Sequence, residues 1–230
     1  AMYPQGGEKV LIYHVTGEKV PEGKLPLDVG AVVLNCTTIS SIARYCRTGL
    51  PLVKKCVTVD GSAVKNPMNV LVPIGMRMKD VFEATGGFKE EPKMVLYGGP
   101  MMGIAVPDLE QPILKNTNAI LAFGEAEATP PEPTACIKCG KCIAHCPLSL
   151  MPCEMETAYK KGNIERLMHL KVNLCMECGC CSFICPAHRP LVQTNKLAKA
   201  QVMAYKNALK AKAEAEKQKL EAEKQKEAAK

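Results

Sequence analysis

The sequence predicts an α+β protein with three parts: a piece of an α/β unit, a small α+β domain, and a helical cysteine-rich domain that continues into a helical tail. Three observations support this prediction. Short apolar and alternating segments bounded by glycine turns fill residues 51–123. A proline-rich segment follows them. Beyond it, apolar residues recur at helical spacing between two cysteine runs. A chain of 230 residues is long enough for two domains with separate cores.

Residues 1–50 are predicted to form part of an α/β unit. Residues 8–15 make a short helical stretch that Gly17 can end, and the apolar run 31–34 suits a buried strand. Residues 38–47 then carry apolar side chains at helical spacing. Such a unit cannot form a core by itself. Because the chain opens directly with this unit, we expect it to be a fragment that lacks an N-terminal part.

Residues 51–123 are predicted to form a small β-grasp-like α+β domain, because hairpin signals and glycine turns separate short strand patterns from one helix. The predicted strands are 56–60, 70–72, 94–97 and 119–122, and the predicted helix is 78–85. The glycine-rich stretch 98–103 is interpreted as a structural turn, since no Lys-Ser or Lys-Thr follows it as in a phosphate-binding loop.

Residues 124–135 contain three prolines and no apolar pattern, which predicts an extended, semi-rigid linker. Residues 136–195 form the cysteine-rich domain. Between its two cysteine runs we expect two short helices joined at Gly162, with Asn163 capping the second. Residues 196–230 are predicted to be a charged helical tail, amphipathic at its start and solvated beyond it.

Two cysteine runs of identical spacing carry the strongest chemical signal. Each reads Cys-x-x-Cys-x-x-Cys-x-x-x-Cys-Pro, and 28 residues separate Cys146 of the first run from Cys175 of the second. This spacing is typical of [4Fe–4S] ligation, and in two-cluster ferredoxins the fourth cysteine of each run ligates the cluster of the other run. The predicted ligands of the first cluster are Cys136, Cys139, Cys142 and Cys185. Those of the second cluster are Cys175, Cys178, Cys181 and Cys146.

Zinc is the alternative metal. Zinc sites use paired Cys-x-x-Cys knuckles and need neither a third cysteine at the same interval nor a following Cys-Pro, so the spacing favours iron. The corresponding alternative function, from a different class, is a zinc-bound scaffold that docks partners. Cys180 could compete with Cys181, but Cys181 matches the position of Cys142. Cys153 falls outside both runs. The isolated cysteines Cys36, Cys46 and Cys56 are expected to be small buried hydrophobes.

The net charge of +7 is unevenly distributed. Residues 196–230 contribute ten Lys and five Glu, or +5, and the other residues contribute 20 basic and 18 acidic side chains, or +2. No basic, aromatic-lined face indicates nucleic acid binding. Cluster thiols must stay reduced, which predicts a reducing compartment for this chain of thirteen cysteines. No signal peptide or run of 18 apolar residues is visible, so we expect no transmembrane span.

Taken together in order, several short stretches resemble the C-terminal part of the C subunit of the Rnf (Rsx) ion-translocating electron-transport complex. The resemblance covers residues 3–195 and extends to the flavin-bearing, NADH-oxidising subunit of respiratory complex I. The matching stretches are Tyr3–Lys9, Leu25–Gly30, Asn35–Thr38, Pro51–Gly61, Leu96–Gly103, and Cys185-Pro186 with Pro190–Gln193.

The resemblance implies a domain order. Residues 1–50 would be the last part of a Rossmann-like FMN and NADH domain, 51–123 a soluble-ligand-binding β-grasp (SLBB) domain, and 136–195 an all-helical ferredoxin domain with two [4Fe–4S] clusters. Along the flavin and nicotinamide pocket would lie Tyr3, Gly7, Glu8, Asn35 and Thr38. The glycine-rich loop that cradles the flavin phosphate in the family lies upstream. We therefore expect FMN and NAD(H) to bind the full-length protein and this chain alone to bind flavin poorly.

The function implied by the resemblance is an electron relay. The protein would pass electrons between NAD(H) and FMN on one side and ferredoxin or membrane subunits on the other, within an ion-translocating ferredoxin:NAD oxidoreductase. Its partners would be the other subunits of the complex, ferredoxin and NAD(H), and it would lie peripherally on the cytoplasmic face of the membrane. An alternative within the enzyme class is a flavin-dependent cobalamin reductase of the same architecture.

Overall fold

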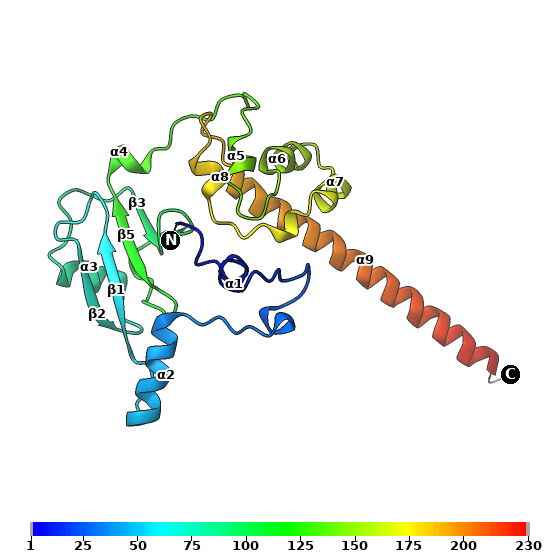
Figure 1. Ribbon diagram of the computed structural model, residues 1–230, viewed down its shortest axis with the longest axis horizontal. Coiled ribbons are helices and arrows are strands. Elements are labelled where there is room, and N and C mark those ends of the chain that lie inside the picture. The colour runs from blue at the N-terminus through cyan, green and yellow to red at the C-terminus, as the bar shows by residue number, and fades with distance from the viewer. Residues whose placement is uncertain (1, 229–230) are drawn as a thin grey trace. The chain divides into compact units, whose positions relative to one another are not determined.

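The computed structural model of the chain describes residues 2–228, with side chains described up to residue 218. The fold is mixed α/β and contains one five-stranded sheet (Figure 1). The chain divides into two compact units, one ending at Glu132 and the other beginning at Pro133. The first unit holds two N-terminal helices and the sheet, and the second holds the cysteine runs and the long C-terminal helix.

The N-terminal segment contains helix α1 (Glu8–Thr16), the 3₁₀ helix η1 (Pro26–Val29) and helix α2 (Cys36–Thr48). Both predicted α-helices are confirmed. Asn35 caps α2, because its Oδ1 accepts a hydrogen bond of 2.9 Å from the Thr37 amide. No residue of α2 is buried, so this helix contributes an exposed apolar stripe rather than a core.

The strand predicted at residues 31–34 is wrong. These residues form no regular secondary structure, and Val32 is 71% exposed. A strand needs a neighbour to satisfy its backbone hydrogen bonds, and within residues 2–228 every named strand belongs to the sheet formed after Val53. The apolar run therefore has no sheet to join here.

The sheet has the strand order β2-β1-β5-β3-β4. Strand β1 pairs antiparallel with β2 and parallel with β5, and β3 pairs antiparallel with β5 and β4. The four predicted strands and the helix are confirmed; β4 was not predicted, because two exposed residues give no alternating pattern. The elements are β1 (Lys54–Asp60), β2 (Met68–Pro73), α3 (Met78–Ala84), β3 (Met94–Tyr97), β4 (Ile104–Ala105) and β5 (Ala119–Phe123).

Alternation along β1 directs its side chains to two faces. Val57 and Val59 are fully buried in the same core as Phe82 of α3, while Cys56 lies on the exposed face. The turn after β1 requires glycine. Gly61 has φ +116°, and a Cβ at this position would lie 2.1 Å from the carbonyl oxygen of Ala122.

The linker is partly helical rather than wholly extended. Residues Glu125–Ala128 form the short helix α4, closed by a hydrogen bond of 3.0 Å from the Ala128 amide to the Gly124 carbonyl. The prolines that follow cannot donate the amide hydrogen bonds of a longer helix, so the regular structure ends there. The sequence pattern revealed the proline-rich half and missed the helical turn.

The second unit is helical. Its core contains Met155 of α6, Leu167 of α7 and Val202 of α9. The helical connection between the cysteine runs is confirmed, and Asn163 caps α7 by accepting a hydrogen bond of 2.8 Å from the Arg166 amide. The elements are α5 (Lys141–Ala144), α6 (Pro152–Lys160), α7 (Ile164–His169), η2 (Val172–Leu174), α8 (Cys180–Phe183) and α9 (Leu191–Ala228).

Helix α9 begins inside the region predicted as the ferredoxin domain and continues as the tail, so the predicted boundary at residue 195 falls within a continuous helix. Its first turns pack against α6 and α7 (Figure 1). Ala198 and Val202 are buried there, whereas Leu209 is 47% exposed. The predicted amphipathic stripe is therefore covered only where α6 and α7 lie against it.

Candidate metal centres

The two cysteine runs adopt the same local conformation. In each run the residue before the second cysteine, Lys138 or Glu177, takes a positive φ, and a short helix carries the third cysteine. Non-glycine residues seldom adopt positive φ, so its repetition at matching positions marks a shared loop shape. Ser149 and His188, three residues after the last cysteine of each run, also match in this respect. The repeated spacing therefore encodes a repeated geometry.

One cavity is lined by cysteines from both runs. Cys146, the last cysteine of the first run, faces the same space as Cys175, Cys178 and Cys181 of the second run. The other residues that line the cavity include Leu150, Val192 and Asn195. The structure thus brings together the four residues predicted as ligands of the second cluster, although Cys146 lies 29 positions before Cys175 in the chain.

Two of these sulfur atoms accept hydrogen bonds from residues outside the cysteine runs. The side-chain amide of Asn195 donates from Nδ2 to Cys175 Sγ at 3.8 Å, and the backbone amide of Leu150 donates to Cys146 Sγ at 3.3 Å. Asn195 is only 1% exposed, and its Oδ1 has no hydrogen-bond partner among the described residues. Such donors stabilise negative charge on sulfur, so this donor set suits thiolates better than thiols.

The four residues predicted for the first cluster are less closely gathered. Cys142 and Cys185 pack in one small buried cluster with Leu191, and Cys181 joins the same cluster. Cys136 and Cys139 lie in an exposed loop. The two sets therefore adjoin through Cys142 and Cys181, and the first set opens to solvent more than the second.

Burial controls the ionisation of these thiols. Burial, together with the charge of neighbouring cysteines, raises the pKa of Cys142 to about 11 and that of Cys181 to about 12. Burial also raises the pKa of Cys175 and Cys178. Thiols must lose their protons to bind iron, so a cationic metal centre would have to offset this burial.

No three Cys, His, Asp or Glu side chains within the described part of the chain come together as a group that could hold a single metal ion. The donors fit an iron–sulfur cluster by their chemical type, and the four predicted ligands of the second cluster line one cavity. The assignment of the eight cysteines as ligands remains a prediction.

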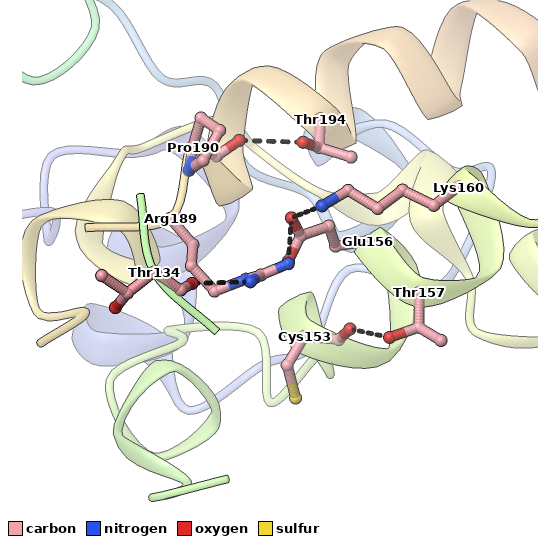
Figure 2. A network of polar contacts seen from close by, with 8 residues as sticks. All are labelled: Thr134, Cys153, Glu156, Thr157, Lys160, Arg189, Pro190 and Thr194. Carbon is pink, nitrogen blue, oxygen red and sulfur yellow. Dashed lines mark hydrogen bonds and ion pairs between the residues drawn. The ribbon is translucent and has the colours of Figure 1, made fainter. Parts of the chain in front are cut away.

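The Arg189 side chain holds the exit of the second run close to the entrance of the first and to α6 (Figure 2). Arg189, four residues after Cys185, donates from Nε and Nη2 to the two carboxylate oxygens of Glu156, each at 2.7 Å. Its Nη1 donates to the carbonyl oxygen of Thr134 at 2.9 Å, and the Thr134 amide donates to the Ala187 carbonyl at 3.0 Å. The entrance to the first run is thus tied to the exit of the second.

Glu156 is 2% exposed and also accepts a contact of 3.0 Å from Lys160 Nζ. Burial alone would raise the pKa of Glu156, but the hydrogen bonds from Arg189 and Lys160 outweigh it and hold the pKa below its usual value. The carboxylate therefore stays charged, and Glu156, which lies on α6, binds Arg189.

The predicted flavin-site residues occupy the starts of two helices. Tyr3 precedes α1, Gly7 and Glu8 begin it, and Asn35 and Thr38 lie at the beginning of α2. The Asn35 side chain is already engaged in capping α2. The structure thus divides these residues between two separate helix starts.

The remaining cysteines divide into two groups. Cys180 lines the same cavity as Cys146, and Cys153 packs against the buried cluster that contains Cys142. The expectation that the three isolated cysteines are buried is wrong, because all of them are exposed: Cys36 and Cys46 lie on α2, and Cys56 lies on the outer face of β1. Among the described residues, no second layer of structure covers these side chains.

Sequence reasoning missed three polar residues around the cysteines: Asn195, Arg189 and Glu156. No spacing motif marks them. Asn195 did leave a signal, because it lies in the same helical stripe as Leu191, Ala198 and Val202, and all four are buried. A polar residue within an apolar stripe indicates a polar partner inside the fold.

Within residues 2–228, no helix combines the length and hydrophobicity needed to cross a membrane. Two protein-family models match the sequence. The SLBB domain family matches residues 56–105, and the Nuo51 FMN-binding domain family matches residues 1–44. The first match covers β1 to β4 of the sheet, and the second covers α1 and most of α2.

Similar curated proteins are found in several bacteria, and each is the C subunit of an oxidoreductase complex. The chain is 41% identical over 202 residues to the C subunit of the Na⁺-translocating ferredoxin:NAD⁺ oxidoreductase complex of Acetobacterium woodii. This match covers 88% of the chain and 46% of that subunit. It is 45% identical over 150 residues to the C subunit of the proton-translocating ferredoxin:NAD⁺ oxidoreductase complex of Clostridium ljungdahlii. This match covers 65% of the chain and 33% of that subunit. It is 37% identical over 200 residues to the C subunit of the ion-translocating oxidoreductase complex of Rhodobacter capsulatus. This match covers 87% of the chain and 38% of that subunit. The chain spans less than half the length of each.

Proposed function

The chain belongs to the family of the C subunits of ion-translocating ferredoxin:NAD⁺ oxidoreductase complexes, and from this relationship we propose that it is the electron-relay part of such an oxidoreductase. In this proposal two [4Fe–4S] clusters lie in the second unit. The first is held by Cys136, Cys139, Cys142 and Cys185, and the second by Cys175, Cys178, Cys181 and Cys146.

One observation carries the proposal: Cys146 lies with three cysteines of the other run around one cavity. Crossed placement of the fourth cysteine is the arrangement of two-cluster ferredoxins. Independent zinc knuckles would instead gather the cysteines of each run around a single ion. The shared cavity favours the cluster.

The chain's own residues supply position, charge and shielding. When bound, a [4Fe–4S] cluster takes up and releases one electron at a time, and FMN exchanges a hydride for single electrons. Leu150 and Val192 exclude water from the cavity of the second set, and the amides of Leu150 and Asn195 donate to its sulfurs. The exposed loop with Cys136 and Cys139 is the more accessible place for exchange with a partner.

FMN and NAD(H) belong to this proposal through the N-terminal segment. The match to the Nuo51 FMN-binding domain supports residues 1–44 as part of a flavin domain. Tyr3, Gly7 and Glu8, with Asn35 and Thr38, are the residues proposed to lie along the flavin and nicotinamide. We expect this chain by itself to bind FMN weakly and the longer protein to bind it tightly.

The partners in the proposal are ferredoxin and the other subunits of a membrane complex. The relatives are named as subunits of translocating complexes, and no described helix of this chain could span a membrane. A peripheral position on the cytoplasmic face of the membrane, held by protein contacts, is consistent with both findings.

The decisive experiment is iron and acid-labile sulfide analysis of anaerobically purified protein, followed by low-temperature EPR of the reduced form. The proposal expects about eight iron and eight sulfide per chain and two interacting reduced-cluster signals. About one or two zinc per chain without iron would contradict it and support a zinc-bound scaffold.

A further inference from the structure

Asn195 occupies an unusual position for an amide. It lies on α9, outside both cysteine runs, and it is 1% exposed where it lines the cavity that five cysteines also line. Nδ2 donates to Cys175 Sγ at 3.8 Å, while Oδ1 has no partner among the described atoms. A buried polar atom without a hydrogen bond costs about 1–3 kcal/mol, so the site favours a function for this side chain over a purely structural role.

The direction of the amide follows from charge. If Cys175 is a thiolate, an amide oxygen facing it would place two electron-rich atoms together, whereas the N–H group is attracted to it. Neighbouring Thr194 behaves differently, because its hydroxyl donates to the Pro190 carbonyl at 3.0 Å and is satisfied within the helix start (Figure 2). Asn195 therefore directs its donor at sulfur rather than at backbone.

Lys199, one helical turn later, fixes the loop that carries Cys175. Its Nζ donates to the Cys175 carbonyl at 3.0 Å and pairs with Glu177 Oε1 at 2.6 Å. Asn195 and Lys199 thus hold α9 against the second run at two points, one at the sulfur and one at the backbone. This arrangement keeps the amide close to Cys175.

We propose that Asn195 is a positioning residue that raises the reduction potential of the cluster held by Cys146, Cys175, Cys178 and Cys181. Reduction adds one electron to the cluster, and much of the added negative charge lies on sulfur. An N–H···S hydrogen bond stabilises that charge and so favours the reduced form. The inference rests on the proposed function, and it assigns to the beginning of α9 a role in setting the order in which the two clusters are reduced.

The test compares Asn195→Leu, which removes the amide at similar volume, with Thr194→Val, which removes a buried polar group that does not reach a cysteine. Each protein is titrated with dithionite in the presence of redox mediators, and the clusters are followed by EPR. We expect Asn195→Leu to keep about eight iron per chain and to shift the midpoint of one cluster to more negative potential. Thr194→Val is expected to leave both midpoints unchanged. Equal midpoints in unaltered protein and Asn195→Leu would overturn the inference while leaving the proposed function intact.

A second measurement does not depend on that variant's stability. Unaltered protein labelled with ¹⁵N in asparagine side chains is reduced and examined by pulsed EPR. We expect a ¹⁵N hyperfine coupling to one cluster that persists in Asn173→Asp, which removes the side-chain amide that lies two residues before Cys175 in the sequence. Absence of the coupling from protein with both clusters would overturn the inference alone. Absence of iron from unaltered protein would overturn the proposed function and the inference with it.

Discussion

Arg189 and Glu156 form a two-armed ion pair, with Nε and Nη2 of the arginine each 2.7 Å from a carboxylate oxygen (Figure 2). The pair connects the exit of the second cysteine run with α6, the helix between the runs. Through its third contact, to the Thr134 carbonyl, Arg189 also reaches the entrance of the first run. A single side chain therefore links three segments that are far apart in the sequence.

Removing one partner of this pair is expected to destabilise the protein strongly. The side chains of Glu156 and Arg189 are 3% and 16% exposed, so Arg189→Met leaves the Glu156 carboxylate buried with only Lys160 beside it. We expect a loss of about 3 kcal/mol in the free energy of unfolding. Urea denaturation followed by circular dichroism under anaerobic conditions measures it.

The matched control is Lys160→Met, which removes the other cation that contacts Glu156. The Lys160 side chain is 61% exposed, so its loss is expected to cost less than about 1 kcal/mol. Equal losses in the free energy of unfolding for the two variants would show that the Arg189–Glu156 pair stabilises the protein no more than the Lys160–Glu156 contact does.

The same pair predicts a pH dependence. Glu156 has a pKa below its usual value of 4.5 in the folded protein, so its contribution to stability is fully present above about pH 4.5 and is lost as the pH falls through the folded pKa. The stability difference between unaltered protein and Glu156→Gln should be constant from about pH 5 to about pH 7 and shrink below about pH 4. Urea denaturation at each pH measures the difference. A stability difference that stays constant down to the pKa of Glu156 in the folded protein would contradict the role given to this carboxylate.

Crossed ligation predicts that Cys146 serves the opposite run. Cys146→Ser should remove the cluster bound by Cys175, Cys178 and Cys181, and lower the iron content from about eight to about four per chain. EPR should then show one reduced cluster without the broadening that arises from a second. Iron analysis and EPR on anaerobically purified protein measure both effects.

Cys46→Ser is the control, because Cys46 is exposed on α2 and lies outside the cysteine-rich unit. It should retain about eight iron. If Cys146→Ser instead kept the cluster of the second run and lost the one of its own run, each run would bind its own cluster.

Gly61 should tolerate no side chain. An added Cβ would lie 2.1 Å from the Ala122 carbonyl oxygen, and φ is +116°, so Gly61→Ala must displace β5 from β1 or change the turn. Backbone strain alone costs about 1–3 kcal/mol, and the overlap adds to it, so we expect a loss of at least about 2 kcal/mol in stability. Urea denaturation of the chain measures the loss.

Gly75→Ala separates the two causes. Gly75 has φ +94° but open space around the Cβ position, so this variant suffers backbone strain without overlap. Its loss should be smaller than that of Gly61→Ala. A loss as large as that of Gly61→Ala would show that the overlap with Ala122 is relieved at no cost.

Local sequence patterns predicted most of the regular structure. The alternation of residues 56–60 became a strand with one face on the core, and the apolar run 94–97 became a strand whose two central residues are both buried. The same reasoning failed at 31–34, where an apolar run has no neighbouring strand, and at Cys56, where alternation directed the side chain outward. Burial depends on what lies opposite, and a local pattern cannot show that.

The sequence by itself determined the chemistry available to this protein. Two identical cysteine runs supply eight thiols at cluster spacing, and the stretches that precede them carry the family relationship. Only the tertiary structure decided which cysteines meet and what surrounds them. Cys146 reaches the second run, Asn195 approaches Cys175 from α9, and Arg189 joins Glu156 to Thr134. The physical reason is that spacing governs contacts within a turn or two of chain, whereas these contacts join segments that only the packing of α6 and α7 against α9 brings together.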